Sequence, residues 1–214
     1  MSAPVPLATG DARELLRATV AQFGPRAALV SALGPQTLCI LQLLRQEGLS
    51  LPTFFLDTGC HFAETLAFRQ EVERHFGVEV HAVRPALDPG PLHATDPERC
   101  CAIRKVQPLQ QLLGGFEAWV SGIRAEQTAD RAEAAAVEWD LRFGLWKVNP
   151  LLGWSRATVD EFLSRHGVPT NPLLASGYRS IGCAPCTQPS TDERGGRWPG
   201  LAKTECGLHR RSSA

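Results

Sequence analysis

The stretch Thr53-Phe54-Phe55-Leu56-Asp57-Thr58-Gly59 has the composition of a buried β-strand followed by its exit turn. β-Branched and aromatic residues favour strands, and Asp, Thr and Gly favour the turn that follows. We expect a helix from Glu64 to Phe76. This segment therefore predicts a strand that passes, after a short turn, into a helix.

The same order of elements recurs along the first half of the chain. The apolar run Ala27–Val30 predicts another buried strand, which leads into a helical stretch ending at Glu47. An amphipathic helix is expected at residues 11–23, and a third strand at residues 78–83. Strands that alternate with helices form βαβ units, so we expect an α/β fold in which helices cover both faces of a parallel sheet.

The second half continues less regularly. A loop at residues 85–97 precedes a helix from about Pro97 to Leu113, which we expect to be bent near Pro108 because proline cannot donate the helical hydrogen bond. Strands are expected at residues 119–122 and 146–150, a loop or weak helix at 125–136, and a helix from Ser155 to His166. Periodicity is lost from Pro169 onward. We interpret residues 1–190 as one α/β domain and residues 191–214 as an irregular, mobile C-terminal tail.

Composition excludes several classes of function. The 214 residues carry 22 basic and 22 acidic side chains, and this balance gives no support for binding to nucleic acid or to an acidic membrane surface. No apolar run approaches the ~20 residues of a membrane span, and residues 1–10 do not resemble a signal peptide. We therefore expect a cytoplasmic protein, in which seven cysteines indicate metal, cluster or redox chemistry rather than disulfides.

Four cysteines form two closely spaced pairs. Cys100 and Cys101 are adjacent, and Cys183 and Cys186 are separated by two residues. Structural zinc pairs generally leave two to four residues between ligands, so the adjacent pair is unusual for zinc. A Cys-x-x-Cys pair alone permits zinc, a redox dithiol or a cluster, whereas a [4Fe–4S] cluster offers one corner to each of four thiolates. For the two isolated cysteines, Cys39 and Cys60, packing as small apolar side chains is the better interpretation.

Three further features point to an anionic ligand. Ser31–Gly34 joins a strand to a helix and could cradle a phosphate, although a plain βα turn explains it equally well. Arginines cluster near the cysteine motifs, and two arginines three residues apart suit phosphate or sulfate oxygens. Cys206 lies between Lys203 and His209, and basic neighbours favour a reactive thiolate, although Glu205 would oppose this.

Beyond these local features, ordered blocks of the sequence resemble the assimilatory adenylyl-sulfate (APS) reductases, relatives of the phosphoadenylyl-sulfate (PAPS) reductases. The blocks are Phe55-Leu-Asp-Thr-Gly59, Cys100-Cys-Ala-Ile-Arg-Lys105, Trp119-Val-Ser-Gly-Ile-Arg124, Lys147-Val-Asn-Pro150, Val168-Pro-Thr-Asn-Pro172, Gly177-Tyr-Arg-Ser-Ile-Gly-Cys-Ala-Pro-Cys-Thr187, Gly196-Arg-Trp198 and Glu205-Cys-Gly-Leu-His209. They span about residues 27–209. The resemblance implies an adenine-nucleotide α-hydrolase-like fold and the reduction of APS to sulfite and AMP.

The resemblance also implies roles for individual residues. Cys206 would attack the sulfate sulfur to form S-sulfocysteine, which thioredoxin or glutaredoxin would resolve. Lys105 would lie between the substrate sulfate and a [4Fe–4S] cluster. The implied cluster ligands are Cys100, Cys101, Cys183 and Cys186. The implied nucleotide and phosphosulfate ligands are Ser31, Gly34, Ser121, Gly122, Arg124, Arg131, Arg194 and Arg197.

The sequence departs from the family pattern in the tail, where Trp198-Pro199-Gly200 replaces the usual run of tryptophans and the span to Cys206 is shortened. Three functions remain open on the sequence. The first is APS reduction; the second is reduction of PAPS, or of both nucleotides, by the same chemistry. The third is a zinc- and nucleotide-binding regulatory protein without catalysis. The sequence leaves the oligomeric state open, a homo-oligomer included.

Overall fold

A computed structural model describes residues 11–209 of the chain. Its centre is a six-stranded sheet with the order β3-β2-β1-β4-β6-β5. All neighbouring strands are parallel except β5 and β6, which pair in the antiparallel sense. The strands are β1 (Ala27–Ser31), β2 (Thr53–Leu56), β3 (Val80–Val83), β4 (Ala118–Val120), β5 (Val137–Asp140) and β6 (Leu145–Val148).

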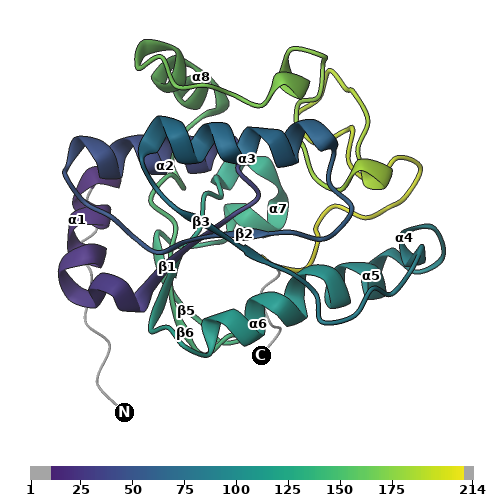
Figure 1. Cartoon of the computed structure of the whole chain (residues 1–214), viewed down its shortest axis with the longest axis horizontal. Coiled ribbons are helices and arrows are strands. Elements are labelled where there is room, and N and C mark those ends of the chain that lie inside the picture. Colours follow the sequence, from purple (N-terminus) through teal and green to yellow (C-terminus); the bar gives the residue numbers. More distant parts are fainter. Residues whose placement is uncertain (1–10, 210–214) are drawn as a thin grey trace.

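Helices cover both faces of the sheet, as the sequence predicts (Figure 1). On one face, α1 (Ala12–Phe23), α2 (Pro35–Gln46), α3 (Ala63–Phe76) and α8 (Arg156–Arg165) contribute to the larger apolar core. On the other face, α6 (Gln107–Leu113) packs against β1 and β4 in a smaller core. The remaining turns are η1 (Gly24–Arg26), α4 (Leu92–Thr95), α5 (Pro97–Cys101), η2 (Ala102–Val106), η3 (Ala125–Gln127), α7 (Ala129–Ala132), η4 (Pro172–Leu174) and η5 (Ala184–Cys186).

Local chemistry explains where the main helices begin and end. The Asp11 carboxylate caps α1 by accepting hydrogen bonds from two backbone N–H groups, and Ser155 caps α8 through the N–H of Thr158 at 3.0 Å. Gly77 ends α3 in the left-handed conformation that glycine adopts most readily. These ends agree with the predicted ones to within a residue or two.

The helix expected to bend at Pro108 is irregular one turn earlier. The chain runs from α5 through η2, a π-helical turn, into α6, and the Gln107 N–H bonds to the carbonyl of Ala102 five residues before it. In a regular α-helix the Pro108 ring would clash with the carbonyl of Arg104. The wider turn avoids this clash, so the helix continues through the proline.

Two elements differ from what the sequence predicts. The short helix α4 lies in the segment expected to be a loop, and β5 adds an antiparallel edge to the sheet. Trp139 of β5 packs edge-on against Trp146 of β6, with ring centroids 5.3 Å apart. Both elements are four residues long, and neither is a continuous apolar run of the kind that marks β1.

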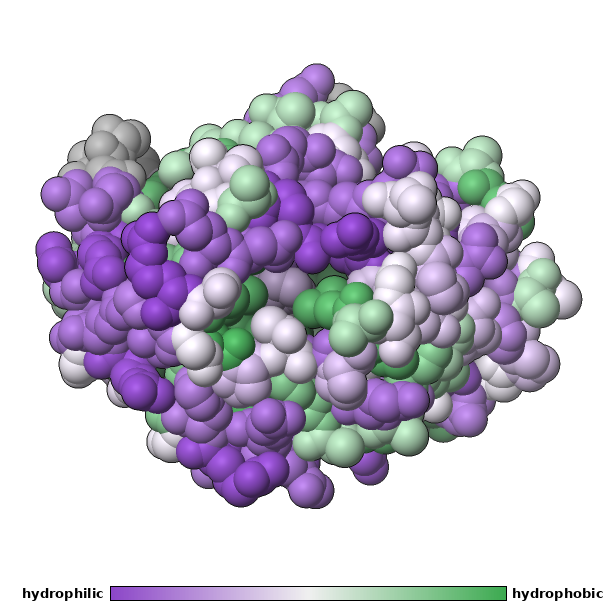
Figure 2. Space-filling model, turned by 90° about the horizontal axis from the view of Figure 1, so that it is seen from above, coloured by the Kyte–Doolittle hydropathy of each residue, from purple (hydrophilic) through white to green (hydrophobic). Residues whose placement is uncertain are grey.

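The surface is mixed in character. The face in Figure 2 is largely hydrophilic, and its apolar side chains form small separate groups. None of the helices within residues 11–209 has the length and apolarity needed to cross a membrane.

Candidate functional site

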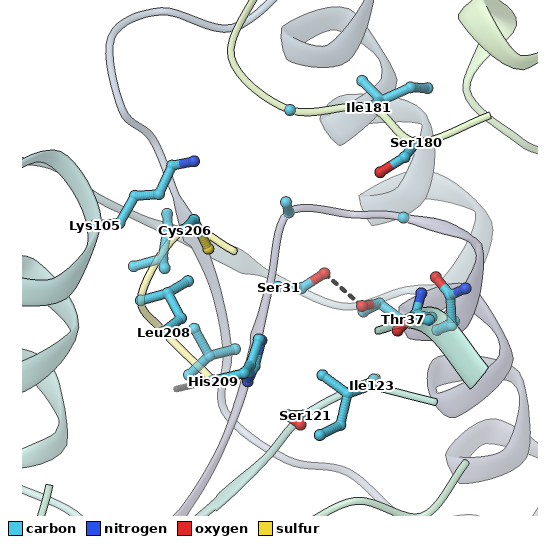
Figure 3. A pocket seen from close by; sticks show the side chains of 18 of the residues that line it. Ser31, Thr37, Lys105, Ser121, Ile123, Ser180, Ile181, Cys206, Leu208 and His209 are labelled. Atoms are coloured by element: carbon cyan, nitrogen blue, oxygen red, sulfur yellow. Dashed lines mark hydrogen bonds between the residues drawn. The ribbon is translucent and has the colours of Figure 1, made fainter. Parts of the chain in front are cut away.

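A cavity opens beyond the carboxyl ends of β1 and β4. Because β1 connects to β2 on one side and β4 connects toward β6 on the other, this is the point where the strand order reverses, the usual ligand site of such sheets. We call it the strand-end cavity (Figure 3). The predicted site residues that line it are Ser31, Gly34, Lys105, Ser121, Gly122, Arg131, Arg194, Arg197 and Cys206.

The turn between β1 and α2 forms one wall of this cavity. The Ser31 hydroxyl accepts a hydrogen bond from the N–H of Leu33 at 2.6 Å and donates one to Thr37 Oγ1 at 2.5 Å. Leu33 has a φ of +57°, and its side chain is buried. Gly34 then occupies the N-cap of α2, where no side chain caps the helix. Pro35 has no N–H and the Thr37 N–H donates to the carbonyl of Gly34 at 3.0 Å, so the first turn of α2 leaves the N–H of Gln36 to an anion.

The turn after β4 forms the opposite wall. The Ser121 hydroxyl donates to Asn149 Oδ1 at 2.6 Å. A Cβ atom on Gly122 would lie 3.0 Å from the Cβ of Gln36 and 3.4 Å from the backbone nitrogen of Thr37. Gly122 therefore allows the two walls to approach each other closely.

The thiol of Cys206 reaches the cavity from the C-terminal tail. Lys105, on η2, lies at the same end of the cavity, as Figure 3 shows. Burial raises the pKa of the Cys206 thiol, but the positive charge of Lys105 and a hydrogen bond from the Leu208 backbone outweigh it, so this pKa falls below its ordinary value. A thiol with a lowered pKa is a better nucleophile near neutral pH.

Glu205, which precedes the thiol, pairs with two arginines, although its negative charge still acts to raise the pKa of Cys206. Its buried carboxylate accepts a hydrogen bond from Arg131 Nη2 at 3.0 Å and lies 3.6 Å from Arg194 Nη2. Thr128 donates a third contact at 3.0 Å. Burial raises the pKa of the Glu205 carboxyl, but the two guanidinium groups bring it below its ordinary value. The sequence does not determine the direction of the Glu205 side chain, and in the structure its carboxylate pairs with Arg131 and Arg194.

Aromatic rings hold the rest of the tail in place. The buried ring of Trp198 lies beneath three cations, with the Arg197 guanidinium 4.5 Å, the Lys203 ammonium 5.3 Å and the Arg194 guanidinium 5.8 Å from its centroid. Such contacts stabilise a cation that has left bulk water. Lys203 also pairs with Glu98 of α5 at 2.6 Å, which connects the tail to the helix that carries the first cysteine pair.

At the end of the described chain, His209 stacks on Trp119. The two rings are 5.6 Å apart and nearly parallel, at 7°. Burial, together with the charges of Arg131 and Lys147, holds the pKa of His209 well below its ordinary value. The imidazole is therefore neutral at physiological pH.

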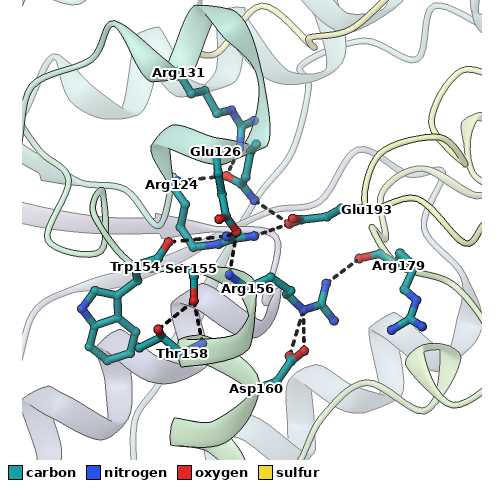
Figure 4. A network of polar contacts seen from close by, with 11 residues as sticks. Arg124, Glu126, Arg131, Trp154, Ser155, Arg156, Thr158, Asp160, Arg179 and Glu193 are labelled. Carbon is teal, nitrogen blue, oxygen red and sulfur yellow. Dashed lines mark hydrogen bonds and ion pairs between the residues drawn. The ribbon is translucent and has the colours of Figure 1, made fainter.

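Arg124 is the one predicted substrate residue that does not line the strand-end cavity. Its fully buried guanidinium donates to the carboxylates of Glu126 and Glu193 (Figure 4). Gln127 also donates to Glu193, at 3.2 Å. Glu193 immediately precedes Arg194, which lines the cavity. Arg124 therefore contacts the tail next to the cavity but does not line the cavity itself.

The two cysteine pairs come together in a second, smaller cavity. Its lining includes Cys100 and Cys101 on α5 and Cys183 and Cys186 at η5. Lys105 lines this cavity as well as the strand-end cavity, and therefore lies between the two. We call the smaller one the cysteine cavity. Among residues 11–209, no three His, Cys, Asp or Glu side chains form a group that could hold a single metal ion.

The two isolated cysteines differ from each other. Cys39 is fully buried in the larger core, as expected. Cys60 instead lines the cysteine cavity, with its thiol half-buried. The position of Cys60 after the exit turn of β2 could have indicated this, because ligand sites of parallel sheets lie beyond the carboxyl ends of the strands.

Comparisons with known proteins agree with this geometry. Residues 26–189 match the phosphoadenosine phosphosulfate reductase domain family. A relative from Rhodococcus opacus, named adenosine 5′-phosphosulfate reductase, is 42% identical over 218 residues and covers 93% of this chain and 88% of its own. A relative from Gloeobacter violaceus, named phosphoadenosine 5′-phosphosulfate reductase, is 40% identical over 209 residues and covers 91% and 87%.

Solved structures show the same fold. The phosphoadenylyl-sulfate reductase of Candida auris, in a phosphate complex, superposes with a TM-score of 0.74 at 26% identity and covers 86% of this chain and 93% of its own. The FMN adenylyltransferase of Candida glabrata gives a TM-score of 0.65 at 20% identity and covers 84% and 64%. The second likeness concerns the fold alone. Both support the predicted adenine-nucleotide α-hydrolase-like architecture.

Proposed function

The chain belongs to the phosphoadenosine phosphosulfate reductase domain family, and we propose that it reduces APS to sulfite and AMP in sulfate assimilation. The relatives named adenosine 5′-phosphosulfate reductase support this substrate. The observation that carries the proposal is the position of Cys206, whose thiol enters a cavity at the strand ends beside Lys105 and three arginines.

In the first step, the Cys206 thiolate attacks the sulfur of APS and displaces AMP. The S–O bond to the phosphate breaks as the new S–S bond forms, and the product is S-sulfocysteine on Cys206. Lys105 stabilises the charge on the sulfate oxygens during attack, which is where a preorganised cation contributes most. No external proton is needed, because AMP leaves as a phosphate anion.

In the second step, a thiol of thioredoxin or glutaredoxin attacks the Cys206 sulfur and expels sulfite. A second thiol of the reductant then resolves the mixed disulfide, so two thiols supply the two electrons of the reduction. Because Cys206 is half-buried, we propose that the tail predicted at residues 191–214, described as far as residue 209, moves on the domain predicted at residues 1–190, described from residue 11 onward. This motion would present the modified cysteine to the protein reductant.

Two sets of residues would hold the substrate. Buried Nε atoms of Arg194 and Arg197 have no hydrogen-bond partner within residues 11–209, and both side chains line the cavity, which suits binding of phosphosulfate oxygens. The nucleotide would rest against the two turns at the strand ends. The members of this second set are Ser31, Gly34, Ser121 and Gly122.

A [4Fe–4S] cluster would be held by Cys100, Cys101, Cys183 and Cys186. The residues present fit such a group, because four thiols line one cavity whose charged lining residues, Arg104 and Lys105, are cations that suit an anionic thiolate-ligated group. When bound, the cluster would hold α5 and η5 together and place its charge beside Lys105. The chain's own side chains carry out the steps described above.

Two measurements test this function. Incubation with APS in the absence of reductant should add one SO₃ group to Cys206, as mass spectrometry of the tail peptide would show. Addition of thioredoxin should release sulfite. The Cys206→Ser variant should still bind AMP but should release no sulfite. Sulfite release by the Cys206→Ser variant would refute the mechanism.

A second candidate substrate is PAPS, since the Gloeobacter violaceus and Candida auris proteins are both named as reductases of that nucleotide. Steady-state kinetics with both nucleotides separates the two, and a clear preference for PAPS would reverse the assignment. We place the protein in the cytoplasm, where thioredoxin and glutaredoxin keep thiols reduced.

A further inference from the structure

A fifth thiol lines the cysteine cavity. Cys60 follows the exit turn of β2 and is half-buried, and it shares this cavity with both cysteine pairs. A [4Fe–4S] cluster takes one thiolate at each of its four corners, so the four cysteines of the pairs already suffice. The role of a fifth thiol in the same cavity is not explained by the proposed cluster or by the reaction at Cys206.

The backbone pairs the segment around Cys60 with the segment around Cys183, with Cys60 hydrogen-bonded to Ala184 and His61 opposite Cys183. The Ala184 N–H donates to the carbonyl of Cys60 at 2.7 Å, and His61 and Cys183 form an isolated antiparallel bridge. The hydroxyl of Thr58 lies 3.2 Å from the sulfur of Cys183. The segment 58–61 therefore runs alongside the residue that begins the second cysteine pair, and any movement of one segment is transmitted to the other.

Cys60 shares the cationic lining of the cysteine cavity with the four other thiols. Arg104 lines the same cavity, and its guanidinium donates to the carbonyl of Thr58 at 2.7 Å, which fixes the loop before Cys60. Cations around a cavity favour an anionic, thiolate-ligated group wherever in the cavity the thiolates stand. The cations Arg104 and Lys105 thus suit a thiolate ligand at Cys60 as well as one at Cys183.

We propose that Cys60 is a reserve ligand of the cluster, able to take the iron that Cys183 holds. In the exchange, the Cys60 thiol loses a proton and its sulfur binds iron, while the Cys183 sulfur leaves iron and takes up a proton. No electrons are transferred. This inference rests on the cluster of the proposed function, which the same experiment examines separately.

The test compares four proteins purified without oxygen: the wild type, Cys60→Ser, Cys183→Ser and the double variant. Iron and sulfide analysis and the visible absorption spectrum are read for each, with circular dichroism as a check of folding. Cys183→Ser should retain most of the wild-type iron, and the double variant should lose it. Two further variants serve as the matched control. Cys101→Ser and the double variant Cys60→Ser/Cys101→Ser should lose iron to the same extent.

The possible outcomes are distinct. A folded Cys183→Ser protein without iron, or equal iron in that variant and in the double variant, overturns the reserve-ligand proposal. A wild type without iron overturns the cluster itself. If Cys183→Ser does not fold, the rate of iron loss to a chelator is compared between Cys60→Ser and the wild type. Cys60→Ser should lose iron about tenfold faster, in line with the loss of metal affinity when a residue that supports a metal site is removed. Equal rates overturn the proposal.

Discussion

The Glu205 carboxylate accepts a hydrogen bond from Arg131 at 3.0 Å, while the adjacent residue, Cys206, lines the strand-end cavity. The tail thus has one side chain fixed to the domain and the next exposed to the candidate substrate. Glu205 is fully buried and Arg131 nearly so. This ion pair fixes the residue before the thiol, and a hydrogen bond from Arg142 to the Gly207 carbonyl fixes the residue after it.

The Glu205→Gln substitution should lower kcat much more than it raises KM. It leaves Arg131 and Arg194 without their charge partner, so the tail should detach more often and Cys206 should be misplaced. We expect kcat to fall roughly 100-fold, the scale for misplacing a reacting group by about 1 Å. Protease cleavage of the tail should accelerate in parallel. The control is Glu161→Gln, which removes an exposed carboxylate of α8 and should change neither quantity.

The same carboxylate makes tail docking depend on pH. The pKa of Glu205 is lower in the docked tail than its ordinary value of 4.5, so docking favours the deprotonated form. The contribution of the Glu205 carboxylate to the free energy of docking is fully present above about pH 4.5. It is lost as the pH falls through the lower pKa that Glu205 has in the docked tail. Hydrogen exchange of residues 191–209, corrected for the intrinsic rate, should therefore increase below pH 4.5. An unchanged pH dependence in Glu205→Gln would contradict this origin.

Lys105→Ala should reduce the rate far more than the affinity for AMP. AMP carries no sulfate, so the ammonium group of Lys105 should contribute little to AMP binding. We expect kcat to fall about 100- to 1000-fold, as on removal of one group that stabilises transition-state charge, with little change in the Kd of AMP. Losses of similar size in both quantities would mean that Lys105 only positions the nucleotide.

Arg124 and Glu193 should behave as one unit. Since Arg124 does not line the strand-end cavity and donates to Glu193, Arg124→Gln and Glu193→Gln should each lower kcat without weakening AMP binding. In a double-mutant cycle their effects should be strongly non-additive. A large loss of AMP affinity in Arg124→Gln alone would instead support direct contact with the substrate, as the family resemblance implies.

Gly122→Ala should destabilise the protein and weaken nucleotide binding. The new methyl group would lie 3.0 Å from Gln36 Cβ, which forces the two walls of the strand-end cavity apart, and overpacking of this kind costs about 1–3 kcal/mol. Gly34→Ala is the matched control for stability, because its methyl group meets only the side-chain oxygen of Gln36, at 3.6 Å, and its φ is −76°. Thermal unfolding measures both.

The sequence predicts the parallel strands and the long helices because burial and periodicity act over many residues. The chain fragments Ala27–Val30 and Thr53–Leu56 are apolar or β-branched throughout, and both form central strands. The edge strand β5 escapes this reasoning, since Val137–Asp140 is short, carries two acidic residues and pairs on one side only, with the next strand along the chain, β6. Its pairing exists only once β6 is in place.

The candidate site divides in the same way. Residues with an unusual spacing, such as the cysteine pairs, could be grouped from sequence, and the structure places all four around one cavity. Which way Arg124 or Glu205 points could not be known, because each has several candidate partners and the choice depends on three-dimensional packing. Cys60 stands alone in the sequence, which favours packing as a small apolar side chain, yet the folded chain brings it into the lining of the cysteine cavity.

The π-helical turn η2 has a consequence for how this helix can tolerate change. Each residue of an α-helix advances the side-chain direction by roughly 100°, and a single π turn accommodates one additional residue without breaking the helix. The turn therefore sets the angular phase between Cys101 and Lys105 and allows one helix to serve two cavities. Deletion of one residue between them would restore a regular helix, yet it would rotate the ammonium away from its place between the cavities. In this part of the chain, the number of residues constrains function as strictly as their identity does.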